Sequence, residues 1–239
     1  MRNSRTDQMK KIFGLILIIL LQDITAQTSV DKKPFGQQAL TIQDFKILVF
    51  VDSVTHPELK QALNVLTEKL TELTNIIQPN QLNLLRQVPI CVEYKLKVDG
   101  AMWYHKSKEW VVSNGYPADI AKCVEICNVK NFLSWQKLNQ PYMVLHELAH
   151  AYHDRVLSSD NADVLVAYQN ALASKKYESV DYNLGGKRRA YALNNADEYF
   201  AELTEAYLGV NDYFPFNKSQ LKDFDPIGYA LMQKTWGDN

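Results

Sequence analysis

The chain has 239 residues, of which 46% are hydrophobic and 22% are charged, and its formal net charge at pH 7 is −1. The length is ample for a single folded core, and the mildly negative charge argues against nucleic acid as a partner. Three cysteines cannot form a disulfide framework. They allow one internal pair at most, and the sequence leaves open whether Cys91 pairs with Cys123 or Cys127.

The N-terminus is typical of a secretory signal peptide. Four basic residues lie within the first eleven, and residues 12–21 form an apolar run that only Gly14 interrupts. This run is too short to span a membrane, which takes about 20 residues, but it matches the apolar segment of a signal peptide. We expect cleavage near Ala26 and a secreted protein whose mature chain has no membrane span. The alternative is an uncleaved signal that anchors the chain to a membrane.

Removal of residues 1–26 takes away four basic and two acidic residues and changes the net charge from −1 to −3. A short polar segment, 27–41, follows. Residues 42–239 then contain no repeat or Pro/Gly-rich linker, which predicts a single domain. Its N-terminal half predicts, in chain order, a strand over 45–51, a capping box at 55–58 before a long amphipathic helix that reaches Ile77, and a hairpin formed by strands 88–98 and 102–112.

The second half is predominantly helical. A strand candidate at 123–129 is followed by the helix that carries His146-Glu147-Leu148-Ala149-His150, and further helices are expected over 162–176, 195–208 and 226–236. A β-rich half followed by an α-rich half predicts an α+β fold, with a small mixed sheet packed against that first helix.

The His-Glu-x-x-His pattern is the strongest chemical signal in the chain. Residues four apart lie on the same face of a helix, so His146 and His150 can bind one tetrahedral Zn²⁺. Glu147 then stands beside the ion as a general base for the attacking water. The alternative is a surface helix with two unrelated histidines. His153 lies about 4.5 Å beyond His150 along the helix axis, so we interpret it as a supporting or packing residue rather than a ligand.

A third zinc ligand is expected on the helix over 195–208. Glu198, Glu202 and Glu205 share one face of this helix, and no Lys or Arg lies four residues from any of them. Like charges at this spacing destabilise a helix by about 0.2–0.5 kcal/mol per pair, so a partner outside the helix is expected. We predict that Glu198 binds the metal and that Glu202 accepts an N–H from a liganding histidine. The alternative for Glu198 is a capping box with Asn195.

Residues 144–154 and 191–209 resemble the catalytic domain of the lethal-factor-like zinc peptidases, a gluzincin-type group. In that family the liganding Glu opens an E-aromatic-aromatic-A-E run, and a catalytic Tyr lies seven residues before it. Glu198-Tyr199-Phe200-Ala201-Glu202 is such a run, and Tyr191 has that spacing. The resemblance implies a zincin-like fold, Tyr191 as the phenol that hydrogen-bonds the oxyanion, Glu147 as general base, and as zinc ligands His146, His150 and Glu198.

The resemblance covers about the C-terminal half of the chain, and nothing here corresponds to the large toxin domains of the family's namesake. From the residues alone, Tyr191 is one tyrosine among 13, and Tyr182 is close enough to compete for its role. We expect a secreted zinc metallopeptidase that hydrolyses a peptide or protein substrate. The alternatives are a catalytically idle zinc-binding or surface-binding module of the same fold and a structural protein without metal.

The predicted strand over 123–129 is our candidate for a sheet edge that receives an extended peptide as an added strand, although an interior position fits the pattern equally well. Trp103, Tyr104 and His105 could line a pocket or belong to the core. Asn217 begins a glycosylation sequon, Asn-Lys-Ser. The sequence indicates neither the cleavage specificity nor the oligomeric state.

Overall fold

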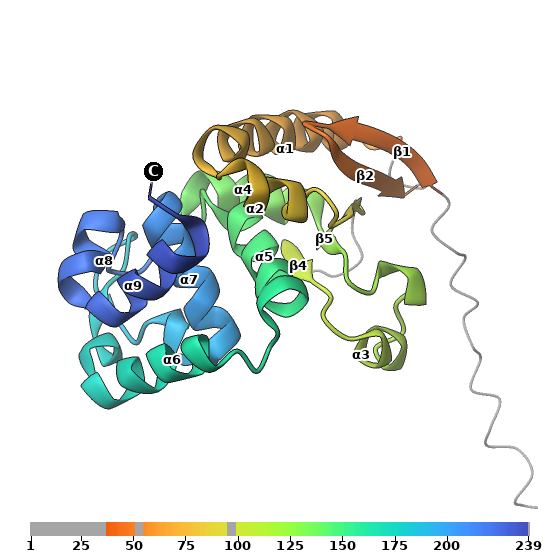
Figure 1. The fold of residues 1–239 in the computed structure, drawn as a ribbon. Coiled ribbons are helices and arrows are strands. Elements are labelled where there is room, and N and C mark those ends of the chain that lie inside the picture. Colours follow the sequence, from red (N-terminus) through yellow and green to blue (C-terminus); the bar gives the residue numbers. More distant parts are fainter. Residues whose placement is uncertain (1–36, 51–54, 95–98, 239) are drawn as a thin grey trace, which may run out of the picture. The chain divides into compact units, whose positions relative to one another are not determined.

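The computed structural model describes residues 37–50, 55–94 and 99–238. The predicted α+β class is confirmed, with a small mixed sheet in the N-terminal half and a helical C-terminal half (Figure 1). The sheet has the strand order β1-β2-β3-β5-β4. Its strands are β1 (Gln37–Ile42), β2 (Phe45–Phe50), β3 (Ile90–Val92), β4 (Met102–Tyr104) and β5 (Val124–Ile126). β2, β3 and β5 are parallel to one another, whereas β1 and β4 join antiparallel at the two edges.

Three strand predictions need correction. β1 overlaps the end of the polar segment expected over 27–41 and pairs with β2 along its whole length. The hairpin is wrong, because β5 lies between β3 and β4 and the second half of the expected strand 102–112 is helical. The strand at 123–129 is interior rather than an edge, so the free edge near the His-Glu-x-x-His helix belongs to β4. Residues 51 and 95–98 of the predicted strands lie outside the described residues.

The sheet places different side chains on its two faces, because successive residues of a strand point in opposite directions. Ile47 and Ile90 lie in the main core together with the apolar face of α1 (Pro57–Ile76). Leu48 and Cys91 point the other way and join a smaller cluster beneath α3 (Lys108–Ser113). The predicted apolar stripe of α1 is confirmed, but its N-cap is His56, which makes no side-chain capping bond, so the predicted capping box is wrong.

All three cysteines are buried and free, and Cys91 shares the smaller cluster with Cys123. Cys91 therefore forms a disulfide with neither Cys123 nor Cys127. The remaining helices of the N-terminal half are α2 (Pro79–Leu85) and α4 (Val129–Leu138), neither of which was predicted.

The C-terminal half is built around α5 (Met143–Tyr152), whose last turn continues as a π-helical turn to Leu157. In Figure 1, α5 lies between β4 on one side and the C-terminal helices on the other, and it contacts both β4 and α7. The other elements are α6 (Ala162–Ser174), the short pair β6 (Val180–Asp181) and β7 (Lys187–Arg188), α7 (Ala196–Leu208), α8 (Lys218–Phe224) and α9 (Pro226–Trp236). The helices predicted over 162–176, 195–208 and 226–236 are confirmed to within two residues.

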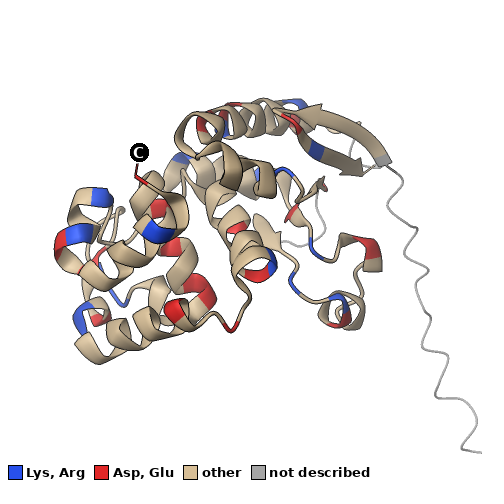
Figure 2. Ribbon diagram, in the orientation of Figure 1, with Lys and Arg blue, Asp and Glu red and all other residues tan. Residues whose placement is uncertain are grey.

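Acidic and basic residues are interspersed over most of the ribbon (Figure 2). Helix α7 is the exception, since it carries Asp197, Glu198, Glu202 and Glu205 and no Lys or Arg. Among the described helices, none is both long and apolar enough to cross a membrane. The expected signal peptide, residues 1–26, lies outside the described part of the chain.

Candidate metal centre and active site

Helix α5 presents a small polar face, and the rest of its side chains are buried in the core. The buried ones are Met143, Val144, Leu145, Leu148, Ala149, Ala151 and Tyr152. His146, Glu147 and His150 are what remains, and they line the side of the helix that faces α7 and β4. The face predicted from the spacing of the two histidines is therefore formed.

The two histidines and Glu198 bring three ligand atoms to one point. Glu198 Oε2 lies 3.1 Å from His146 Nε2 and 3.2 Å from His150 Nε2. Two ligand atoms bound at about 2.0–2.1 Å to a tetrahedral Zn²⁺ are about 3.3 Å apart, so these separations fit a common ion. The three side chains are mostly buried, with 11–17% of their surface exposed. Imidazole nitrogen and carboxylate oxygen are also the donor types that zinc prefers.

The capping alternative for Glu198 is half right. The side chain of Asn195 accepts the main-chain N–H of Glu198 at 2.9 Å and thereby caps α7. The carboxylate of Glu198 does not complete a capping box, because it points to the histidines. The hydrogen bonds from His146 and His150 hold the pKa of Glu198 well below its usual range, although burial alone would raise it. Glu198 is thus ionised, as a metal ligand must be.

The carboxylate that contacts Nδ1 of the candidate ligand His146 is that of Glu205 rather than that of Glu202. Glu205 Oε1 lies 2.6 Å from His146 Nδ1, whereas Glu202 Oε1 is 4.0 Å from the same nitrogen. A neutral imidazole that donates Nδ1–H to Glu205 leaves its Nε2 free to bind metal. The predicted role of Glu202 is therefore filled by a different residue of the same helix. A second group that could hold a metal ion lies around Nδ1 of His146 and consists of His146, Glu202 and Glu205.

His153 is fully buried and contacts Asp197, the residue that precedes the candidate ligand Glu198. Its Nδ1 lies 2.9 Å from Asp197 Oδ1, and its ring stacks on Phe200 with centroids 5.0 Å apart. Asp197 also pairs with Lys106 at 2.7 Å. Burial would raise the pKa of Asp197, but His153 and Lys106 lower it to about 2. The interpretation of His153 as a packing residue thus agrees with its position.

Glu147 lies beside the candidate metal ligands His146 and His150 and is held by the edge strand. Its Oε2 accepts the main-chain N–H of Tyr104, in β4, at 2.7 Å. Burial raises the pKa of Glu147, which makes its carboxylate a stronger base than an exposed glutamate. One oxygen is thus held by the strand, so the other is free to contact a water molecule.

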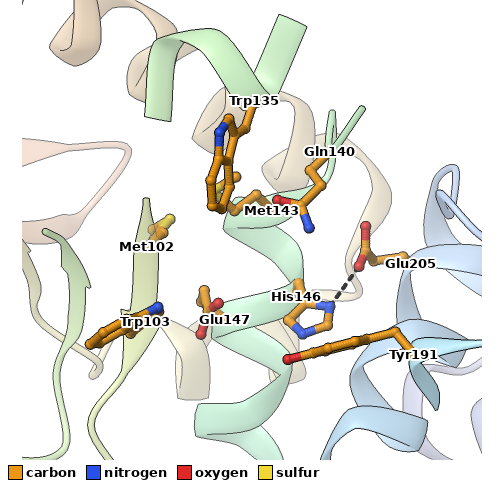
Figure 3. A pocket seen from close by; sticks show the side chains of 9 residues that line it. All are labelled: Met102, Trp103, Trp135, Gln140, Met143, His146, Glu147, Tyr191 and Glu205. Carbon is orange, nitrogen blue, oxygen red and sulfur yellow. Dashed lines mark hydrogen bonds and ion pairs between the residues drawn. The ribbon is translucent and has the colours of Figure 1, made fainter. Parts of the chain in front are cut away.

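Tyr191 lies in a single 3-10 turn, Tyr191–Leu193, immediately before α7. Its ring centroid is 6.4 Å from that of His146, and 43% of the residue is exposed. Figure 3 shows the ring reaching across toward α5 into a cavity that Glu147 also lines. Burial of the phenol, followed by the nearby charge of Glu198, raises the pKa of Tyr191 to about 12. The phenol is therefore protonated at neutral pH and can donate a hydrogen bond.

The cavity around these groups has a volume of about 120 Å³. Its remaining lining includes Met102 and Trp103 from β4, Trp135 from α4, and Gln140 (Figure 3). The sequence did not indicate a role here for Met102, Trp135 or Gln140. These apolar and amide residues belong to separate elements, so no regular spacing along the chain connects them to the site. Trp103 was considered as a pocket residue, and it does line this cavity.

Tyr182, the alternative to Tyr191, and the imidazole of His105 lie outside this cavity. Tyr182 is buried, and its hydroxyl accepts the amide of Asn139 at 3.1 Å. His105 is buried in an aromatic cluster, with Nε2 2.6 Å from Glu125 Oε2. Neither lines the 120 Å³ cavity.

One signal for Glu205 was present in the sequence. At 3.6 residues per turn, a residue seven positions after Glu198 points about 20° away from it, whereas one four positions after points about 40° away. Glu205 therefore follows the direction of the ligand more closely than Glu202 does.

Neither protein-family models nor curated proteins nor solved structures produced a match to this chain.

Proposed function

We propose that this protein is a zinc-dependent peptidase of zincin-like fold that hydrolyses peptide bonds. The observation that carries the proposal is the convergence of His146 Nε2, His150 Nε2 and Glu198 Oε2 in the immediate neighbourhood of Glu147 and Tyr191. These groups come from three separate segments of the chain. A structural ion pair would need neither the extra carboxylate nor the phenol.

His146, His150 and Glu198 would hold the ion, which when bound supplies Lewis-acid activation of a water molecule and of the scissile carbonyl. Glu147 accepts the proton of the attacking water and passes it to the amine that leaves. Tyr104 fixes this carboxylate through its main-chain N–H. Tyr191 donates its phenolic hydrogen to the oxygen of the tetrahedral intermediate, where negative charge develops.

The edge strand β4 provides a docking site for an extended peptide. Tyr104 directs its N–H away from β5 to Glu147, and alternation along the strand gives Met102 the same outward direction. Met102 also lines the 120 Å³ cavity. A substrate strand paired with β4 through main-chain hydrogen bonds would therefore pass directly in front of Glu147.

The signal-like N-terminus supports secretion as part of the same proposal, with a peptide or protein as the external substrate. The resemblance of residues 144–154 and 191–209 to lethal-factor-like peptidases supports it independently of the geometry.

The test combines metal analysis with peptide hydrolysis. Purified protein should contain one zinc per chain and should cleave members of a mixed peptide library. Glu147→Gln should keep the zinc and reduce turnover by about 10²–10⁴-fold, because the base is lost and the ligands are kept. Glu68→Gln, at an exposed position of α1, is the matched control and should behave as wild type. Zinc binding without any cleavage would favour the catalytically idle module, and absence of zinc would refute the proposal.

A further inference from the structure

A second cavity adjoins the first and shares Trp135, Gln140 and Tyr191 with it. Its volume is about 310 Å³, at the lower end of the range for small-ligand sites. The lining residues outside the shared ones are Asn139, Tyr182, Glu202, Asp212 and Tyr213. A peptide bound in front of Glu147 would therefore have one of its side chains next to this cavity.

Two carboxyl groups in the lining give the cavity an acidic character. Glu202 is 3% exposed and Asp212 is 5% exposed. The Oε2 atom of Glu202 is buried and has no hydrogen-bond partner within the described part of the chain. Among residues 37–50, 55–94 and 99–238, no Lys or Arg lies within ion-pair distance of either carboxyl group. His146 Nδ1 lies 4.0 Å from Glu202 Oε1 but is already paired with Glu205 at 2.6 Å. Burying two carboxyl groups with so little compensating positive charge costs free energy, so the cavity is suited to a further cation.

The walls of the same cavity are aromatic. Trp135, Tyr182 and Tyr213 line it, and the rings of the two tyrosines are 4.9 Å apart. The guanidinium of Arg188 already lies 4.0 Å from the centroid of the Tyr182 ring, which shows that this ring can receive a cation. Arg188 itself is exposed and is not part of the lining. Aromatic faces attract the stem and head of a lysine or arginine side chain, and the carboxylates neutralise its charge.

We propose that this cavity is a specificity pocket for a cationic group of the substrate, a lysine or arginine side chain adjacent to the scissile bond. The inference rests on the proposed peptidase function and deepens it by naming the substrate class. The free amino terminus of a short peptide offers the same ammonium chemistry, and the experiment separates the two sources.

The test uses matched pairs of peptides that differ at one position. Each pair carries lysine or its uncharged analogue norleucine next to the cleaved bond, with the N-terminus either free or acetylated. Acetylated lysine peptides should be cleaved with kcat/KM about tenfold to a hundredfold above the norleucine peptides, the range expected for hydrogen bonds to a charged group. Cleavage that requires a free N-terminus and does not distinguish lysine from norleucine would identify the amino terminus as the occupant and overturn the side-chain assignment.

Asp212→Asn and Glu202→Gln test the pocket with almost no change of shape. Each should reduce the ratio of kcat/KM for lysine over norleucine peptides by about tenfold. Asp181→Asn is the matched control. Asp181 is the last residue of β6 and directly precedes Tyr182, but its carboxylate pairs with Lys187 at the exposed surface. The substitution removes the same charge and should leave the ratio unchanged. An equal loss of the ratio in Asp181→Asn would mean general electrostatic attraction and would overturn the proposal.

Binding separates this proposal from the peptidase proposal. Zinc-loaded Glu147→Gln protein should bind the acetylated lysine peptide about tenfold more tightly than the norleucine peptide, as measured by fluorescence anisotropy. If wild type cleaves nothing but this difference persists, the peptidase proposal fails and the pocket stands. If wild type cleaves lysine and norleucine peptides equally and the binding is equal, the pocket fails and the peptidase proposal stands.

Discussion

At the scale of single residues, the chemistry of this site depends on negative charge that α7 concentrates on one face. Glu198 and Glu205 contact opposite nitrogens of His146, at 3.1 and 2.6 Å. Burial by itself would lower the pKa of His146, but these two carboxylates raise it well above its usual value. The metal must displace the proton from Nε2 in order to bind, so zinc affinity should fall as the pH falls.

Glu205 should matter more for zinc retention than Glu202. Glu205→Gln removes the charged acceptor of His146 Nδ1–H and should weaken zinc binding by about 10–100-fold. Glu202→Gln, in the same helix and equally buried, should weaken it less, because Glu202 Oε1 is 4.0 Å from that nitrogen. Competition with a chelator of known affinity measures both. The opposite order would restore the role that the sequence predicted for Glu202.

Tyr191 should act in the transition state and not in ground-state binding. Tyr191→Phe removes one donor to the oxyanion and should lower kcat by about 10²–10³-fold with little change in KM. Tyr182→Phe is the control and should retain near wild-type kcat, because that hydroxyl is engaged with Asn139. Steady-state kinetics on one fluorogenic peptide decides between them. If Tyr182→Phe were inactive and Tyr191→Phe were active, the role of oxyanion donor would belong to Tyr182.

At the scale of elements, the edge strand β4 is fastened to both helices of the site. The hydroxyl of Tyr104 donates to Asp154 at 2.6 Å, and its N–H donates to Glu147. Lys106, just after the strand, pairs with Asp197 at the start of α7. These contacts hold the outer edge of β4 in a fixed position relative to the proposed metal ligands. The proposed substrate strand would therefore dock against a rigid surface.

Asp154 connects β4 to the end of α5 and should give a pH-dependent contribution to stability. Burial would raise its pKa, but Lys122 and Tyr104 lower it below the usual 3.8. A carboxyl group with a lowered pKa stabilises the fold fully above its unfolded-state pKa, and this contribution is lost as the pH falls through the folded-state pKa. Asp154→Asn should therefore lower Tm by about 2–4 °C at pH 7, which corresponds to about 1 kcal/mol.

The same difference in Tm should shrink as the pH falls below 3.8 and through the lower pKa of folded Asp154. Calorimetry of both proteins at several pH values measures it. Asp163→Asn serves as the control, because Asp163 pairs with Lys234 at an exposed site. A difference that grows at low pH would show that the ion pair with Lys122 does not operate as described.

At the scale of the whole molecule, the metal would join α5 to α7, two helices separated by 43 residues of chain between Tyr152 and Ala196. A ligand that binds only the folded state stabilises it by about 2.7 kcal/mol at a concentration one hundred times its Kd. For a chain of this size that corresponds to about 5–10 °C in Tm. Chelation should lower Tm by this amount, and added zinc should restore it. His150→Ala should show no response to either treatment.

The three buried thiols provide a check on the core of the molecule. Native protein should react slowly with a thiol reagent, because Cys91, Cys123 and Cys127 are all buried. Unfolded protein without reductant should react with three equivalents per chain. Reaction of a single equivalent after unfolding would show that two of the cysteines form a disulfide, contrary to the structure.

The sequence by itself determined the parts of this protein that depend on local periodicity. The faces of α1 and α5, the extents of α7 and α9, and the shared direction of His146 and His150 follow from 3.6 residues per turn. The α+β class follows from the order of strand-like and helical segments. Glu198 could be chosen as a ligand only by adding the His-Glu-x-x-His pattern and the family resemblance to its place in the helix, because the helix alone left the capping alternative open.

Only the tertiary structure decided which strands pair and which side chains meet. The pairing of β5 between β3 and β4 joins segments that are distant in sequence, and no spacing encodes it. Periodicity places Glu205 close to the direction of Glu198, but the contact of Glu205 with His146 depends on how α7 is rotated against α5, which is set by packing of its buried side chains. Asp212, which lies in a loop with no periodic pattern, reaches the second cavity only because the chain folds back beside Tyr182. Local periodicity fixes the direction of a side chain relative to its own helix, whereas its partner is fixed by the packing of the whole core.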